Sequence, residues 1–183
     1  ATATAGDITD SGQLRITGAA TFTAANGQNI YLDNLDSSDT EFAIHTFSGA
    51  VTFAASSGNL LNVTVRNSGA FDFGAALTLA TGGNLIVTAG GNVTQTGGAL
   101  TVPGTTTVSA AGKTVTLSNS SNNFTGAVSI DALTVDLEDA NAIVLGASTV
   151  TDNYLVTAAG AVTQNSDTAQ AGSSTTITLA TDA

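Results

Sequence analysis

Three short phrases of this chain are nearly the same. Residues 6–12, 91–97 and 160–166 read GDITDSG, GNVTQTG and GAVTQNS, each with an aliphatic residue followed by threonine. A chain that repeats short alternating segments folds by stacking similar units, so its core is a column. The repetition predicts an elongated β-solenoid rather than a globular enzyme.

The repetition extends beyond these phrases. Ile8, Val93 and Val162 are 85 and 69 residues apart, and blocks between them also align, for example FSGAVTF at 47–53 with FTGAVSI at 124–130. These matches predict one segment, 1–183, with pseudo-repeats at 6–90, 91–159 and 160–183, the last of them partial. Between Asn34 and Phe47 the first unit is eight residues longer than the matching stretch from Asn119 to Phe124. We expect this insertion to leave the stack at one corner.

Strand signals run along nearly the whole chain. Val, Ile and Thr alternate with small polar residues, as in 114–117, 133–137 and 176–179, and Gly, Asn, Asp or Ser separates the runs. This period of two predicts short strands and no helix. At roughly 20–25 residues per coil, the chain would make about eight or nine coils. Small and β-branched inward residues favour a narrow parallel column, in which Asn34 and Asn119 would stack their amides. An antiparallel β-sandwich is the alternative.

The charge balance limits the partners. Only 9% of the residues are charged, and Lys and Arg total three against fourteen Asp and Glu, for a formal net charge of −11. Nucleic-acid binding requires clustered cations and is therefore excluded. Anionic membrane surfaces and acidic polysaccharides are poor candidates for the same reason, and no apolar run approaches the ~20 residues of a membrane helix. Neutral glycans, cations, other proteins and copies of the chain itself remain.

The chain has no cysteine, which excludes a disulfide scaffold and suits an exported protein. It does not begin with Met and shows no signal peptide, so we expect a segment of a longer or processed chain.

One group of carboxylates is a candidate for catalysis. Asp136 and Glu138 are two residues apart on an expected strand and so share a face, with Asp131 and Asp139 nearby. Sites that cleave acidic glycans usually add a cationic residue to such a group, and none accompanies these residues. We expect a solvated acidic face and no enzyme. A polysaccharide-active enzyme on the same scaffold is the alternative.

A second group was considered for metal binding. The insertion offers the oxygen ligands of Asp33, Asp36, Asp39 and Glu41, with His45 as a weaker candidate. The spacing of an EF-hand loop and the glycine-rich calcium repeat are both absent. A calcium-stabilised surface module is therefore a further alternative, no other cofactor is expected, and Asp36, Asp39, Glu41 and His45 are candidates for contacts with a partner.

The best-repeated segments resemble a known family. Residues 91–102 (GNVTQTGGALTV), 114–119 (TVTLSN), 122–130 (NNFTGAVSI) and 142–148 (AIVLGAS) are similar to repeats of filamentous-haemagglutinin-like bacterial exoproteins and adhesins. The resemblance covers most of the chain, is best from 84 to 165, and weakens at runs such as FDF at 71–73. It implies a right-handed parallel β-helix exported to the cell surface, and it supplies no catalytic residues.

Repeats, charge and resemblance together predict a structural or adhesive extracellular rod. It would be part of a large exported bacterial surface adhesin or of a self-assembling extracellular filament. Neither end of the sequence resembles a cap, so we expect the ends to continue into more chain or to stack on another copy. The other expected partners are a host or neighbouring-cell surface protein and a neutral glycan.

Overall fold

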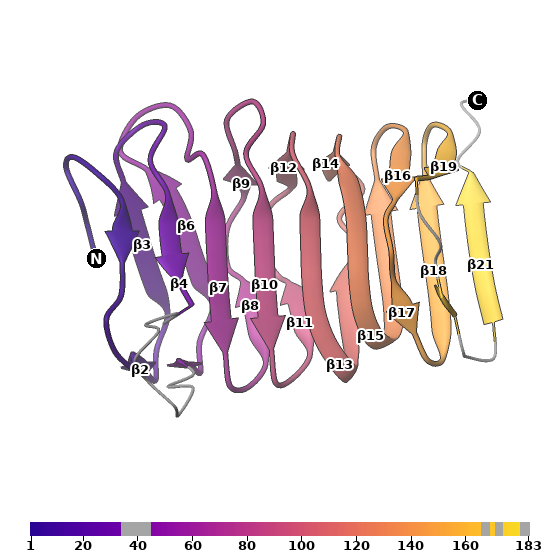
Figure 1. Cartoon of the computed structure of the whole chain (residues 1–183), viewed down its shortest axis with the longest axis horizontal. Helices are drawn as coiled ribbons and strands as arrows, with labels where there is room; N and C mark the ends of the chain where they lie inside the picture. Colours follow the sequence, from indigo (N-terminus) through magenta and orange to yellow (C-terminus); the bar gives the residue numbers. More distant parts are fainter. Residues whose placement is uncertain (34–44, 166–168, 171–173, 180–183) are drawn as a thin grey trace.

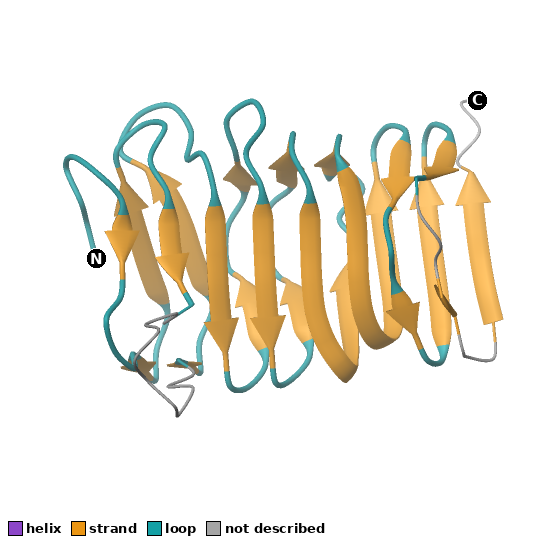
Figure 2. Cartoon of the chain, viewed as in Figure 1, coloured by secondary structure: helices purple, strands orange, loops and turns teal. Residues whose placement is uncertain are grey.

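The computed structural model describes residues 1–33, 45–165, 169–170 and 174–179, and this part of the chain contains strands and loops without a helix (Figure 2). Its strands pair in parallel throughout. The parallel β-solenoid is therefore confirmed, and the antiparallel alternative is wrong. Within the described residues, no helix exists that could cross a bilayer.

Three faces recur along the stack. The first face holds β1 (Ile8–Thr9), β4 (Ile30–Leu32), β7 (Val63–Asn67), β10 (Leu85–Ala89) and the first halves of β13 (Thr106–Leu117) and β15 (Ala127–Asp139). The second face holds the other halves of β13 and β15 with β3 (Ala20–Ala24), β6 (Val51–Ala55), β8 (Phe71–Phe73), β11 (Val93–Gln95), β18 (Asn153–Ala158) and β21 (Ser174–Leu179). The third face holds β9 (Leu77–Thr78), β12 (Leu100–Val102) and β14 (Asn123–Phe124).

Shorter strands complete the stack. β2 (Arg15–Ile16) pairs with β5 (Thr46–Phe47), which lies between the first and second faces of its coil. Further along, β16 (Ile143–Leu145) and β17 (Thr149–Val150) both pair with the first half of β15. They are followed in the next coil by β19 (Val162–Gln164) and β20 (Ala169–Gln170).

The number of coils follows from the strand register, because each paired residue on one face lies one coil further along the stack. Successive partners on the first face are Ile8, Ile30, Val63, Leu85, Thr106, Val128, Leu145 and Gln164, which gives seven steps. The solenoid therefore makes about seven turns, not eight or nine. In Figure 1, β7 and β10 run down the near side, β8 and β11 run up the far side, and the chain advances from left to right. The coil is therefore right-handed.

One coil is longer than its neighbours. Ile30 and its partner Val63 are 33 residues apart, whereas Val63 and Leu85 are 22 apart. This coil contains the predicted insertion and is eleven residues longer than the coil that follows it. Residues 34–44 lie outside the described part of the chain, and so do the candidate ligands Asp36, Asp39 and Glu41.

The interior is a narrow apolar column. Inward residues alternate with outward ones along each strand, and the inward set is mainly Val, Leu, Ile, Ala and Phe. Burying a side chain of this size contributes about 1.5–3 kcal/mol. Five phenylalanines form one continuous aromatic stack in the N-terminal half: Phe22, Phe47, Phe53, Phe71 and Phe73, with ring centres 5.0–6.3 Å apart. The run at 71–73, where the family resemblance weakens, is therefore core.

Candidate functional site

Two of the four carboxylates considered for catalysis share an outer surface. Asp136 and Glu138 both point outward from the second half of β15 and are partly exposed, as predicted. Asp136 lies between Thr116 and Leu155 in the strand register, and the next residue in line with Glu138 is Thr157. No cation therefore stands in line with either carboxylate on these adjoining described strands. On these strands, therefore, no cationic residue that could bind an acidic sugar accompanies the pair.

The other two carboxylates lie elsewhere. Asp131 is exposed on the first face, whereas Asp139 turns into the interior and is only 2% exposed. The Asp139 carboxylate accepts backbone N–H bonds from Phe124 at 2.6 Å and from Asn141 at 2.7 Å. Burial raises the pKa of Asp139, and these two hydrogen bonds offset part of that rise. The Asp139 carboxylate therefore supplies hydrogen-bond acceptors for backbone N–H groups at the end of β15, which stabilises the fold.

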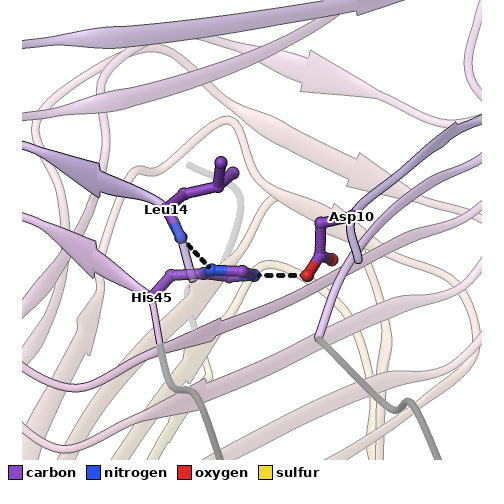
Figure 3. A network of polar contacts seen from close by, with 3 residues as sticks. All are labelled: Asp10, Leu14 and His45. Atoms are coloured by element: carbon purple, nitrogen blue, oxygen red, sulfur yellow. Dashed lines mark hydrogen bonds and ion pairs between the residues drawn. The ribbon is translucent and has the colours of Figure 1, made fainter. Parts of the chain in front are cut away.

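His45 lies in the core at the end of the insertion. Its side chain is fully buried and packs against Phe47, with ring centres 5.6 Å apart. Nδ1 accepts a hydrogen bond from the Leu14 N–H at 3.0 Å, and Nε2 lies 3.3 Å from Oδ2 of Asp10 (Figure 3). Because Nδ1 is an acceptor, the neutral ring carries its proton on Nε2, facing Asp10. Nδ1 is thus occupied by the Leu14 N–H, and a metal ion at that atom would have to displace it.

The calcium hypothesis stays a prediction. Of its four carboxylate candidates, only Asp33 lies in the described chain, where its side chain is partly exposed. Among the described residues, no three His, Asp or Glu side chains come together in a group that could hold a metal ion.

Most of the buried polar side chains share one role. Five of them accept a backbone N–H from the neighbouring coil at a corner or strand end: His45 from Leu14, Asn67 from Phe47, Asn122 from Leu100, Asp139 from Phe124 and Ser148 from Ile130. At these positions the backbone turns away from the neighbouring coil, and each side chain accepts the N–H that a backbone carbonyl would accept in a regular strand pair. Sequence reasoning missed Asn67, Asn122 and Ser148. Each continues the inward alternation of its strand or lies just before that strand, and this pattern could have revealed them.

A polar ladder runs up the outside of the stack, beside the first face. Asn29 donates to Asp7, Asn62 to Asn29, and Asn84 to Asn62, at 2.7–3.1 Å. Thr105 closes it by donating its N–H and hydroxyl to Asn84, both at 2.8 Å. Stacked asparagines were predicted, but at other positions: Asn119 instead accepts a local bond from Ser121, and Asn34 lies outside the described residues.

Beside this ladder the outer surface is hollowed. Tyr31, Thr64 and Ile86 are successive outward residues in register on β4, β7 and β10. They line a hollow of about 380 Å³ together with Asn62, Asn84 and Thr105. Ile86 is 40% exposed, the most exposed large apolar side chain among the described residues. A second, apolar hollow of about 410 Å³ opens beside the first coil and includes Ile8, Leu14, Phe22 and Leu32 in its lining.

The family match covers almost the entire chain. A family described as repeats of unknown function (DUF5649) matches residues 1–54, 60–131 and 132–183. The chain belongs to this family. The three DUF5649 segments agree with the repetitive solenoid seen here. No curated protein and no solved structure matches the chain. The comparisons therefore support the repeat class, and the likeness to haemagglutinin-type adhesins stays an expectation.

Proposed function

We propose that this chain is a structural and adhesive rod segment of an extracellular, bacterial cell-surface β-solenoid. The observation that carries the proposal is the unbroken parallel stacking, which runs from Thr2 against Thr23 to β18 against β21. Each added coil extends such a rod by about 4.8 Å. Its outer faces are then held at a fixed distance and orientation, which suits presentation of binding surfaces.

The chemistry of the outer surface supports binding over turnover. Outward positions are mostly Thr, Ser and Asn, and the Asp136–Glu138 pair has only Thr and Leu in line with it on adjoining strands. The adhesive role needs no reacting group, and partners without dense negative charge suit a chain of net charge −11.

The first coil offers an edge for end-to-end stacking. Ile8 donates its N–H to the Asn29 carbonyl at 2.9 Å, so the adjacent Thr9 directs its N–H away from the stack. An open parallel edge of this kind accepts a further coil, either from more of the same chain or from another copy.

The adhesive role is tested with fluorescent beads that carry the chain on a C-terminal tag. We expect such beads to be retained on host or bacterial cell layers under flow, while beads carrying an unrelated acidic β-protein wash off. The same preparation, incubated with neutral and acidic polysaccharides, should release no new reducing ends. Retention equal to the control beads, or turnover that Asp136→Asn abolishes, would contradict the proposal.

Stacking is tested by sedimentation and electron microscopy. We expect concentration-dependent end-to-end assembly that Thr9→Pro reduces, because proline removes the outward N–H without touching the Ile8 bond. The control is Thr4→Pro, because Thr4 lies outside any strand. Thr107→Pro would not serve, because Thr107 lies inside a paired strand. Discrete single particles at every concentration would exclude self-stacking and leave only continuation of the chain.

A further inference from the structure

The hollow beside the asparagine ladder has the shape of a small ligand site. Tyr31 and Ile86 are its largest side chains, and Thr64 lies between them in register, one coil from each. Because neighbouring strands are about 4.8 Å apart, the two large side chains stand about 10 Å apart across a smaller one. A flat ring fits between two such walls.

The polar atoms of the hollow are held in place. The Asn62 carbonyl accepts both the backbone and the side-chain amide of Asn84, at 2.9 and 3.1 Å. The Asn62 side-chain amide donates one bond, to Asn29 at 2.8 Å, which leaves its second hydrogen for a ligand. No hydrogen bond within the described chain uses the hydroxyl of Tyr31 or Thr64. The site thus presents donors and acceptors whose positions are fixed by the ladder, which lowers the ordering cost of binding.

The side chains that line the hollow indicate which class of ligand it can bind. All six lining residues are uncharged, so the hollow offers no partner to an ionic group, and the net charge of −11 repels anions. One aromatic and one aliphatic wall suit the C–H face of a sugar ring, while the amide and hydroxyl groups suit its hydroxyls. We propose that this hollow binds one ring of a neutral glycan. The proposal rests on the adhesive role and names the site and ligand class for it.

The test follows the side-chain amides of the ladder. The ¹⁵N-labelled chain is titrated with cellotetraose, mannotetraose and xylotetraose, and with trigalacturonate as the charged counterpart. We expect at least one neutral tetrasaccharide to shift the side-chain amide signals of Asn62 and Asn84 in the millimolar range, and trigalacturonate to leave them unchanged. Tyr31→Ala should weaken that binding by roughly tenfold, the size of one lost aromatic contact.

A matched pair of variants provides the control. Ile86→Thr removes a wall and makes the position like its neighbours Thr64 and Thr107, so the fold should tolerate it. Leu133→Thr removes a similarly exposed apolar side chain, 39% against 40% exposed, from β15. Binding should fall several-fold in the Ile86 variant only. The idea fails if no neutral tetrasaccharide shifts the ladder amides, if both variants weaken binding equally, or if trigalacturonate binds as well.

The two proposals fail separately. If beads carrying Tyr31→Ala adhere as well as wild type, adhesion uses another surface and the sugar site is not its cause. If wild-type beads do not adhere although the tetrasaccharide shifts the amides, the hollow binds sugar and the adhesive role is wrong.

Discussion

At the residue scale, the outer ladder depends on asparagines that both donate and accept. Asn62 occupies its centre and bonds to Asn29 on one side and Asn84 on the other. If the Asn62 side chain is removed, Asn84 loses the acceptor of its backbone and side-chain N–H groups, whereas Asn29 still accepts the backbone N–H of residue 62.

Asn62→Ala should therefore lower the free energy of unfolding by about 1–3 kcal/mol, the usual cost of leaving partly buried backbone and amide groups unbonded. Asn119→Ala is the control, since its carbonyl serves only the nearby Ser121 in an exposed turn. We expect that variant to cost less than about 1 kcal/mol. Urea unfolding of the two variants measures the difference, and equal costs would mean that the ladder contributes nothing beyond local turns.

Asp139 should make stability depend on pH in a defined direction. Its pKa is raised in the folded chain, so the native state holds the proton more tightly than the unfolded state does. Its favourable contribution is complete below the unfolded pKa and is lost as pH rises through the folded one. Lowering the pH from about 7 to about 4 should therefore stabilise wild type relative to Asp139→Asn.

Urea midpoints of both proteins at several pH values provide this test. The other carboxylates titrate alike in the two chains, so their effects cancel in the difference. A difference that stays flat would show that the bonds from Phe124 and Asn141 cancel the effect of burial, and one that moves in favour of Asp139→Asn on acidification would show that they outweigh it. Either result would contradict the prediction.

His45 should act as an acceptor in the core and not as a ligand. His45→Ala leaves the Leu14 N–H without its partner, so we expect the Leu14 amide to exchange with solvent at least tenfold faster, which corresponds to about 1.4 kcal/mol. Asn67 performs the same task for Phe47 in the next coil, so His45→Asn should restore most of the protection. Equal exchange in both variants would contradict this role.

At the scale of the element, the corner between the third and first faces requires close approach of two backbones. A Cβ on Gly126 would collide with the Gly104 carbonyl in the coil before, whereas a Cβ on Gly12 would meet nothing within 4 Å. β13 and β15 each continue round a different corner, between the first and second faces, and so belong to two faces.

Gly126→Ala should accordingly destabilise the protein by about 1–3 kcal/mol, the range found for overpacking. Gly12→Ala should change the unfolding free energy by less than about 0.5 kcal/mol. Thermal or urea unfolding distinguishes them, and a neutral Gly126→Ala would mean that the corner relaxes without cost.

At the scale of the whole molecule, stability is a sum over coils and their contacts. Removing residues 63–84 deletes one 22-residue coil and brings Asn62 directly before Leu85, in the place of Asn84. Ile30 then meets another buried aliphatic residue, and the ladder keeps an asparagine. This variant should fold, with a β-sheet circular dichroism spectrum and a single cooperative transition.

Removing only residues 63–73 is the contrasting deletion. This deletion removes β7 and β8 but keeps β9, so the coil loses its strands on the first and second faces and cannot complete a turn between its neighbours. We expect that variant to be unfolded or aggregated. If both deletions folded equally well, the complete 22-residue coil would not be the repeating unit of this structure.

Much of the architecture was readable from the chain itself. The period of two predicted the strands and the faces of residues such as Asp136 and Glu138, and the repeats predicted stacking and the insertion. These features depend on local alternation, which any strand pairing preserves. The sequence did not predict which residues stack on one another from coil to coil. Ile8 and Val93 occupy the same place in matching phrases, yet Ile8 stacks with Ile30 on the first face and Val93 with Phe71 on the second. The phrase is a local strand signal that fits either face.

Only the tertiary structure decided what the corners do. His45 was considered as a ligand and Asp139 as part of an acidic surface, but both turn inward and accept N–H groups from a coil that is distant in sequence. Tyr31, Thr64 and Ile86 look unrelated in the sequence, and they line one hollow because coil lengths of 33 and 22 residues bring them into register. Alternation is a property of neighbouring residues, whereas a corner or a surface site depends on where each coil closes, and that is set by the sum of its loops.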